Sequence, residues 1–221
     1  MENLLEQVRI LIVDDHPMAR EAMKEILSEE PTFQVIAEAK TAREAIKMTQ
    51  KHMPDLILMD IRLPDQSGIE VTREIKAAFP YVKIVMVTVS DDIVDLFESI
   101  KNGAQGYLIK QVDHESWIPY LKAIMNDDAH IDEWLATQLL QEFSQSNKDQ
   151  DMPDPNLSKR EHEILTLVAK GLTNKEISLQ LEISEYTVKN HLKNLFQKLH
   201  LNNRVQLAKY AYEHGIVKPN R

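Results

Sequence analysis

Asp60 is the first residue of this 221-residue chain whose type and position suggest chemistry. It ends "DLILMD" (55–60), a run apolar enough to form a buried strand, and a loop containing Pro64 and Gly68 follows. Taken alone, an aspartate at a strand end is more often structural than chemical. The residues that close the other apolar runs decide between these two interpretations.

Four other polar residues close apolar runs in the same way. Asp14 and Asp15 follow "VRILIV", Thr88 ends "VKIVMVT" and Lys110 ends "GYLIK". In a doubly wound sheet, ligands bind beyond the carboxyl ends of the strands, where these side chains would meet. Carboxylates this close raise one another's pKa unless a cation lies between them, and Mg²⁺ prefers a few carboxylates together with phosphate oxygens. The set therefore predicts a site at which Asp60 carries a phosphoryl group.

The elements that must position these residues alternate between strand and helix. Strands are expected at 8–15, 33–39, 55–60, 82–88 and 106–110. Helices are expected from Pro17, from the capping box of Thr41 and Glu44, over 68–79, over 93–103, and up to Met125. This alternation predicts an α/β domain with a five-stranded, doubly wound parallel sheet.

A polar stretch separates this part from an all-helical tail. A helix is expected over 131–143, and "SQSNKDQDMPDPN" (144–156) is polar with two prolines, which is typical of a flexible linker. In the tail, "TNKEISLQL" and "SEYTVKNHLKNLFQKL" predict a helix-turn-helix. The domains are therefore expected at 1–127 and 157–221, with a linker helix and flexible linker at 128–156.

Charge divides the chain in the same place. Residues 157–221 carry a balance of +5, whereas residues 1–156 carry −14. A basic tail on an acidic protein favours a polyanion as the partner of the tail, the alternative being a difference between solvated surfaces. In the second tail helix, Lys189, Asn190 and Lys193 lie opposite the apolar face. Lysine and asparagine can bond guanine and adenine, which favours double-stranded DNA over ordinary solvated side chains.

Composition limits the class of protein further. The chain has no cysteine, which excludes a disulfide scaffold and a thiolate metal site and suits the cytoplasm. No apolar run approaches the length of a membrane span, and the N-terminus lacks a signal-peptide pattern. The expectation is a cytoplasmic protein without a membrane partner.

Residues 8–127 resemble the receiver domain of two-component response regulators. The matching motifs are "DD" (14–15), "MDIRLPDQSG" around Asp60, "VTVS" (87–90) and "GYLIK" (106–110). The resemblance implies a flavodoxin-like fold in which Asp60 accepts a phosphoryl group from a histidine kinase. The Mg²⁺ ligands that it implies are Asp60, one or both of Asp14 and Asp15, and the backbone carbonyl of Arg62. It also implies that Thr88 and Lys110 sense the phosphate and that Tyr107 is the aromatic switch residue.

Three positions around this pocket need separate interpretation. Gln111 stands where many receivers have proline, so the cis peptide that is usual there is left open. Val89 stands where a small residue often gives access to the phosphate, so slower phosphorylation is expected. His16 is interpreted as a polar residue at a helix start, the alternative being a pH-sensitive neighbour of the metal.

Residues 157–217 resemble the LuxR-type DNA-binding domain. The matching features are Arg160-Glu161, Gly171, Asn174-Lys175-Glu176-Ile177 and Thr187-Val188-Lys189. The DNA contacts that the resemblance implies are Lys175, Thr187, Lys189, Asn190 and Lys193. His200 stands where the family often has glycine, so the turn there is expected to depart from the family.

Both halves together resemble a NarL/FixJ-type response regulator, a phosphorylation-controlled transcription factor that binds promoter DNA. A homodimer is expected as the active form, because the last helix (203–213) has apolar residues on two sides, of which one would be free for a twofold contact. Contact with RNA polymerase is compatible with this function. The alternative is a phosphate-independent DNA-binding regulator with a degenerate receiver.

An enzyme is not expected. A phosphatase of the haloacid dehalogenase type would need an acid/base aspartate two positions after its nucleophile. Arg62 stands there in this chain, and its guanidinium cannot transfer a proton at neutral pH.

Overall fold

The computed structural model describes residues 7–89, 93–110, 114–126 and 157–217. The chain forms two compact units, Met1–Met125 and Asn126–Arg221. The helix expected over 131–143, the linker expected over 144–156 and the Lys110–Gln111 peptide lie outside the described residues.

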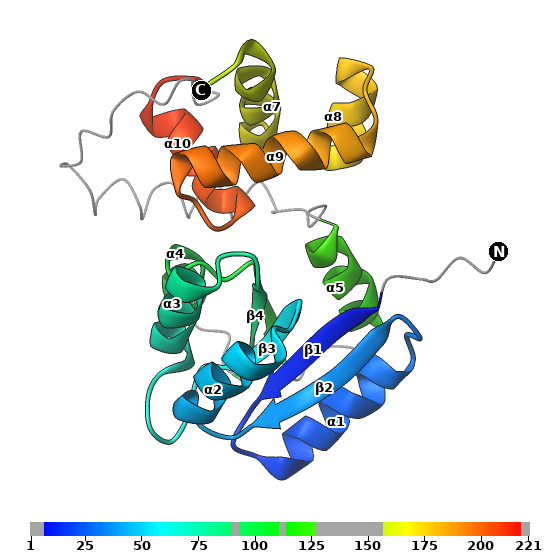
Figure 1. Cartoon of the computed structure of the whole chain (residues 1–221), viewed down its shortest axis with the longest axis vertical. Helices are drawn as coiled ribbons and strands as arrows, with labels where there is room; N and C mark the ends of the chain where they lie inside the picture. Colours follow the sequence, from blue (N-terminus) through cyan, green and yellow to red (C-terminus); the bar gives the residue numbers. More distant parts are fainter. Residues whose placement is uncertain (1–6, 90–92, 111–113, 127–156, 218–221) are drawn as a thin grey trace. The chain divides into compact units, whose positions relative to one another are not determined.

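The first unit is a parallel sheet of five strands in the order β2-β1-β3-β4-β5 (Figure 1). Its strands are β1 (Val8–Val13), β2 (Phe33–Ala39), β3 (Leu56–Asp60), β4 (Lys83–Thr88) and β5 (Gly106–Ile109). Its helices are α1 (Pro17–Ser28), α2 (Ala42–His52), α3 (Gly68–Ala78), α4 (Ile93–Lys101) and α5 (Trp117–Met125). Helices α1 and α5 cover one face, and α2, α3 and α4 cover the other. The predicted doubly wound α/β fold is therefore confirmed.

Burial on both faces explains why the central strands are apolar along their length. Every residue of β3 is buried, and so are the last four residues of β1 and the last five of β4. Strands covered by helices on both sides must place apolar side chains in both directions. The first polar side chains therefore stand at the carboxyl ends of these strands, where the covering helices give way to loops.

Gly68 fixes how closely α3 approaches the end of β3. A Cβ atom at Gly68 would lie 1.9 Å from the carbonyl oxygen of Asp60 and 3.1 Å from Met59 Cγ. The Gly68 N–H also donates to the Ile61 carbonyl at 2.8 Å. The helix therefore begins against the backbone of the Asp60 loop, and only glycine leaves enough room.

Among its described residues the second unit contains helices alone, as predicted from the tail. They are α7 (Lys159–Ala169), α8 (Asn174–Leu181), α9 (Glu185–Leu199) and α10 (Arg204–Glu213). The two predicted capping boxes are present, since Ser158 and Thr173 each accept from the N3 backbone while the N3 glutamate accepts from the cap. Ser184 and Asn203 cap α9 and α10 through their side chains.

Three polar contacts fasten these helices together. Lys198 of α9 lies 2.7 Å from Glu161 of α7, whose side chain is buried. Arg160 donates to the Leu181 carbonyl at the end of α8 at 2.7 Å. Arg204 of α10 donates to Asn174 Oδ1 at 3.0 Å and also to the Leu172 carbonyl, both at the start of α8. The residues "RE" that carry the LuxR resemblance thus have structural partners within the unit.

Helix α10 packs apolar residues from more than one side against its own unit. Val205, Leu207 and Ala211 are buried, whereas Ala208 and Tyr212 are only partly buried. Ala208 and Tyr212 pack against the core of the unit, and the Tyr212 hydroxyl donates to the Ala169 carbonyl at 3.1 Å. A twofold contact through one apolar side of this helix stays a prediction.

No helix among the described residues is both long enough and apolar enough to cross a membrane.

His200 forms the turn at which a departure from the family is expected. It ends α9 in the left-handed conformation, with φ 52° and ψ 40°, which glycine adopts at low cost. A residue with a Cβ held in this region costs about 1–3 kcal/mol. The chain therefore makes this turn with a residue less suited to it than glycine.

We expect Gly68→Ala to lower the free energy of unfolding of the first unit by about 1–3 kcal/mol, the usual cost of overpacking. Urea unfolding followed by circular dichroism measures this change. Glu70→Ala is the control, because Glu70 is exposed in the same helix turn and its loss should cost about 1 kcal/mol or less. Equal effects of the two variants would contradict the close approach of α3 to Asp60.

We expect His200→Gly to raise the free energy of unfolding of the second unit by about 1 kcal/mol. Glycine removes the Cβ strain but loses roughly 0.5–1 kcal/mol to the greater freedom of the unfolded chain. Thermal unfolding of the full chain measures the gain. His200→Ala keeps the Cβ atom, so a gain as large in this variant would show that backbone strain is not the cause.

Candidate functional site

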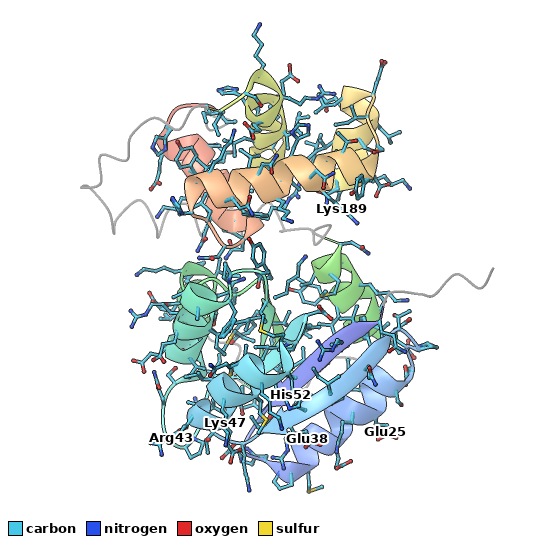
Figure 2. The ribbon with its side chains drawn as sticks, viewed as in Figure 1. Glu25, Glu38, Arg43, Lys47, His52 and Lys189 are labelled. Carbon is cyan, nitrogen blue, oxygen red and sulfur yellow. The ribbon has the colours of Figure 1, made fainter. Side chains whose placement is uncertain are left out.

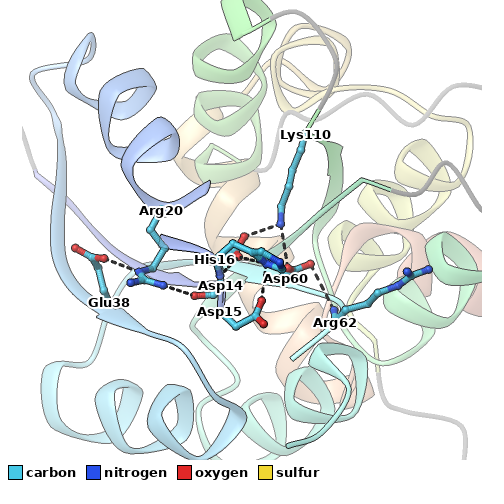
Figure 3. Close-up of polar contacts among 8 residues, drawn as sticks. All are labelled: Asp14, Asp15, His16, Arg20, Glu38, Asp60, Arg62 and Lys110. Carbon is cyan, nitrogen blue, oxygen red and sulfur yellow. Dashed lines mark hydrogen bonds and ion pairs between the residues drawn. The ribbon is translucent and has the colours of Figure 1, made fainter. Parts of the chain in front are cut away.

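Two buried carboxylates and one ammonium form the centre of the site. Asp14 follows β1 and Asp60 ends β3, and both are almost inaccessible to solvent. These strands are neighbours, with Val13 paired to Met59. Lys110, directly after β5, reaches both carboxylates, its Nζ lying 2.6 Å from Asp14 Oδ2 and 2.9 Å from Asp60 Oδ2 (Figure 3).

The other oxygen of each carboxylate has a different partner. Asp14 Oδ1 accepts from the His16 N–H at 2.9 Å, and Asp60 Oδ1 accepts weakly from the Arg62 N–H at 3.4 Å. The Oδ2 atoms thus share the ammonium, and the Oδ1 atoms meet backbone donors. Each aspartate therefore keeps one oxygen that Lys110 does not contact.

Burial and charge act against each other in this group. Burial raises the pKa of Asp60 above its ordinary value and the Asp14 carboxylate adds to the rise, while the contact with Lys110 acts in the opposite direction. Burial lowers the pKa of Lys110, but the bonds to Asp14 and Asp60 outweigh burial, so this pKa lies above its ordinary value. The lysine therefore stays charged, and the charge on Asp60 is held at a cost.

Thr88 and Tyr107 differ in where the structure places them. Thr88 ends β4 and is buried, and its carbonyl accepts from the Lys110 N–H at 2.7 Å. Asp60 lies opposite Val87 in the neighbouring strand. Thr88 is therefore brought to the same edge of the sheet as the carboxylates. Tyr107 is partly buried and packs against the core on the α2 and α3 side of the sheet.

Asp15 and His16 complete the acidic cluster at its solvent side. The side chains are 34% and 71% exposed, and His16 Nδ1 lies 2.7 Å from Asp15 Oδ1. This is an ion-pair distance, although Asp15 Oδ1 makes no hydrogen bond there. One ligand atom from each of Asp14, Asp15, His16 and Asp60 lies within 4.8 Å of all the others. The oxygen-rich donor set is chemically suited to a divalent cation.

Arg20 is a participant that the sequence interpretation missed. Its Nη1 donates to the Asp14 carbonyl at 2.8 Å, and its Nε donates to Glu38 Oε2 at 2.7 Å (Figure 3). It thereby ties the backbone beneath the acidic cluster to β2. The sequence feature that could have identified Arg20 is its position four residues after His16, near the start of the helix that follows the acidic pair.

The second candidate site is the exposed face of α9. Val188, Leu192, Leu195 and Leu199 are buried as predicted, and Phe196 is partly buried. Of the predicted contact residues, Lys175, Asn190 and Lys193 are exposed and Lys189 is partly buried. Thr187 is the exception, because its N–H and hydroxyl both engage Ser184 Oγ, at 3.1 and 2.8 Å. Its hydroxyl therefore serves the cap of α9.

Two family models match the chain. Residues 10–122 match the response regulator receiver domain, and residues 155–211 match the bacterial regulatory proteins of the luxR family. The first match contains the acidic cluster and Lys110, and the second contains α8 and α9. Each described unit thus corresponds to one of the two models.

Similar proteins match over nearly the whole chain. The transcriptional regulatory protein DegU of Brevibacillus brevis is 34% identical and covers 96% of each chain. The oxygen regulatory protein NreC of Staphylococcus carnosus (strain TM300) is 37% identical over 95% of this chain and 99% of its own. The crystal structure of a LuxR-family two-component response regulator from Aurantimonas sp. SI85-9A1 has a TM-score of 0.56, with 30% identity over 62% of this chain and 99% of that chain.

The order of the two units, the acidic edge of the first and the helix-turn-helix of the second agree with these matches. The relatives share the full arrangement of units and not one domain alone. The chain therefore belongs to the NarL/FixJ-type response regulators, in which a receiver domain is joined to a LuxR-type DNA-binding domain.

Proposed function

We propose that Asp60 accepts a phosphoryl group from the phosphohistidine of a histidine kinase, and that this modification controls binding of promoter DNA. A P–O bond forms at an Asp60 oxygen as the P–N bond breaks, and the electron pair of that bond stays on the kinase imidazole. The observation that carries the proposal is the Lys110 ammonium shared by the buried carboxylates of Asp14 and Asp60.

The neighbouring side chains have roles that follow from their charges and positions. Asp60, Asp14 or Asp15 and the Arg62 carbonyl would hold Mg²⁺, which would supply positive charge to the phosphoryl oxygens. Lys110 exchanges the Asp60 carboxylate for a phosphoryl oxygen, because the negative charge lies on the phosphoryl group once the acyl phosphate has formed. The Thr88 hydroxyl donates to another phosphoryl oxygen, and Tyr107 moves with β5.

The second unit is the part that binds double-stranded promoter DNA, with α9 in the major groove. Support comes from the exposed Asn190 and Lys193 on the face of α9 opposite its core, and from the positive balance of residues 157–221. The relative DegU is named a transcriptional regulatory protein. A homodimer on paired half-sites is the active form, and the partly exposed Ala208 and Tyr212 of α10 are candidates for its contact.

A phosphate-independent regulator with a degenerate receiver is not favoured. In a receiver that is no longer phosphorylated, two buried carboxylates would lower the stability of the fold without contributing to function. The described pocket instead keeps both buried carboxylates, the buried threonine and the lysine. The experiment below separates the two functions.

We expect Asp60→Asn to abolish phosphoryl uptake from acetyl phosphate in the presence of Mg²⁺, because an amide is not a nucleophile. Phosphate-affinity electrophoresis measures the uptake. Asp65→Asn is the control, since Asp65 accepts from the Ala42 and Arg43 N–H groups and is not part of the acidic cluster. Equal uptake by Asp60→Asn and the wild type would contradict the assignment of the acceptor.

We also expect Asp60→Asn to unfold at a higher temperature than the wild type at neutral pH. The pKa of Asp60 is higher in the folded chain than in the unfolded chain, so the folded protein loses stability as the pH rises through the interval between these values. Above that interval the charge opposes folding, and the neutral amide does not. The gain should vanish when unfolding is measured below about pH 3, where the carboxyl is mostly protonated in both states.

We expect Lys189→Ala and Lys193→Ala to weaken DNA binding in distinguishable ways. A lysine on a phosphate should lower affinity for all sequences and reduce the salt slope by about one. A lysine on a base should cost about 1–3 kcal/mol and relax preference at one position. Lys159→Ala, an exposed change on α7, is the control. Unchanged affinity for both α9 variants would mean that α9 is not the recognition helix.

A further inference from the structure

His16 occupies a position that its side chain does not use in the usual way. It is the N-cap residue of α1, where a side chain ordinarily accepts from the first free N–H groups of the helix. The His16 side chain makes no such bond, and the next residue, Pro17, has no N–H to offer. The interpretation of His16 as an ordinary polar helix-start residue therefore does not account for its side chain.

The imidazole turns instead toward the acidic cluster. Nδ1 lies 2.7 Å from Asp15 Oδ1 and 3.4 Å from Asp14 Oδ1 (Figure 3). Lys110 occupies the Oδ2 atoms of both buried aspartates, so the Oδ1 atom of Asp14 is the one on the His16 side. A nitrogen donor thus joins the oxygen donors on the side of the cluster that Lys110 does not fill.

The spacing of these atoms matches the coordination sphere of a small divalent ion. Metal–ligand bonds of about 2.1 Å place adjacent ligands of an octahedron about 3.0 Å apart and opposite ligands about 4.2 Å apart. The two distances from His16 Nδ1 lie near the first value, and the limit of 4.8 Å on all four groups lies just above the second. Small side-chain movements would bring the four groups onto one ion.

We propose that His16 Nδ1 is a ligand in this pocket for divalent ions that accept imidazole, of which Zn²⁺ is the example tested below. The inference rests on the proposed function, because the same pocket would hold Mg²⁺. Magnesium binds oxygen donors and gains little from imidazole, whereas zinc, iron and nickel bind imidazole well. The carboxylates therefore allow the pocket to bind a divalent ion, and His16 determines which ions it prefers.

The exposed position of His16 makes this role testable without loss of the fold. Its side chain is 71% exposed, and the backbone contacts of residue 16 do not depend on the ring. His16→Gln removes the nitrogen ligand and keeps a polar side chain of similar reach. His52→Gln is the matched control, because His52 stands at the far end of α2 (Figure 2) and outside the cluster.

Calorimetric titration of the unphosphorylated full chain with Zn²⁺ and with Mg²⁺ gives the two affinities. Zinc binding is assigned to the acidic cluster only where excess Mg²⁺ displaces the zinc. Loss of a partner that only orients a ligand lowers metal affinity about 10-fold to 100-fold, so loss of a ligand should lower zinc affinity at least about tenfold. We expect this loss in His16→Gln, with a much smaller change for Mg²⁺, and no loss in His52→Gln. In the wild type, the ¹⁵N resonance of His16 Nδ1 should shift on addition of zinc and not on addition of magnesium.

Each other outcome has a definite meaning. Zinc that competes with magnesium but binds His16→Gln as tightly as the wild type would overturn the proposal and leave an oxygen-only site. Zinc that does not compete with magnesium, or an unshifted Nδ1 resonance, would overturn it as well. If Mg²⁺ itself does not bind, the cation part of the proposed function fails, which is a separate result.

Discussion

The whole first unit is organised around two like charges that are held out of water. Asp14 and Asp60 are buried side by side because β1 and β3 are neighbours in the sheet. One ammonium, from Lys110, lies against both. A buried carboxylate pair with a single counter-charge is unfavourable, and an added cation or a change in one carboxylate alters the balance. The pocket is therefore poised to respond to chemistry at Asp60.

The rest of the receiver unit serves this arrangement. The strand order brings the ends of β4 and β5 beside β3, so that Thr88 and Lys110 reach the same edge. Gly68 lets α3 start against the Asp60 carbonyl, and Arg20 holds the Asp14 carbonyl from the other side. In the second unit, buried apolar residues and the Glu161–Lys198 pair hold α9 in place and leave its polar face exposed.

Most of the fold and the candidate pocket residues could be predicted from the sequence, because apolar runs that end in polar or charged residues can be recognised in it. Other features were not visible. The closeness of Gly68 to Asp60 arises between residues eight apart in a loop, and the reach of Arg20 to a carbonyl depends on a side-chain conformation. The apolar pattern of α10 did not show which of its residues the core buries and which stay partly exposed, because that depends on how the helices pack. His16 was interpreted as a polar residue at a helix start because residue type and position do not show which way a side chain turns.

The central claim is that the carboxylate of Asp60, poised beside Asp14 and Lys110, is the atom group that becomes phosphorylated. Borohydride reduces an aspartyl phosphate to homoserine, so peptide mass mapping of the reduced, phosphorylated chain identifies the modified residue directly. The account predicts homoserine at position 60 and at no other aspartate. Homoserine at another position, or a phosphoryl group on a residue that borohydride leaves unchanged, would contradict it.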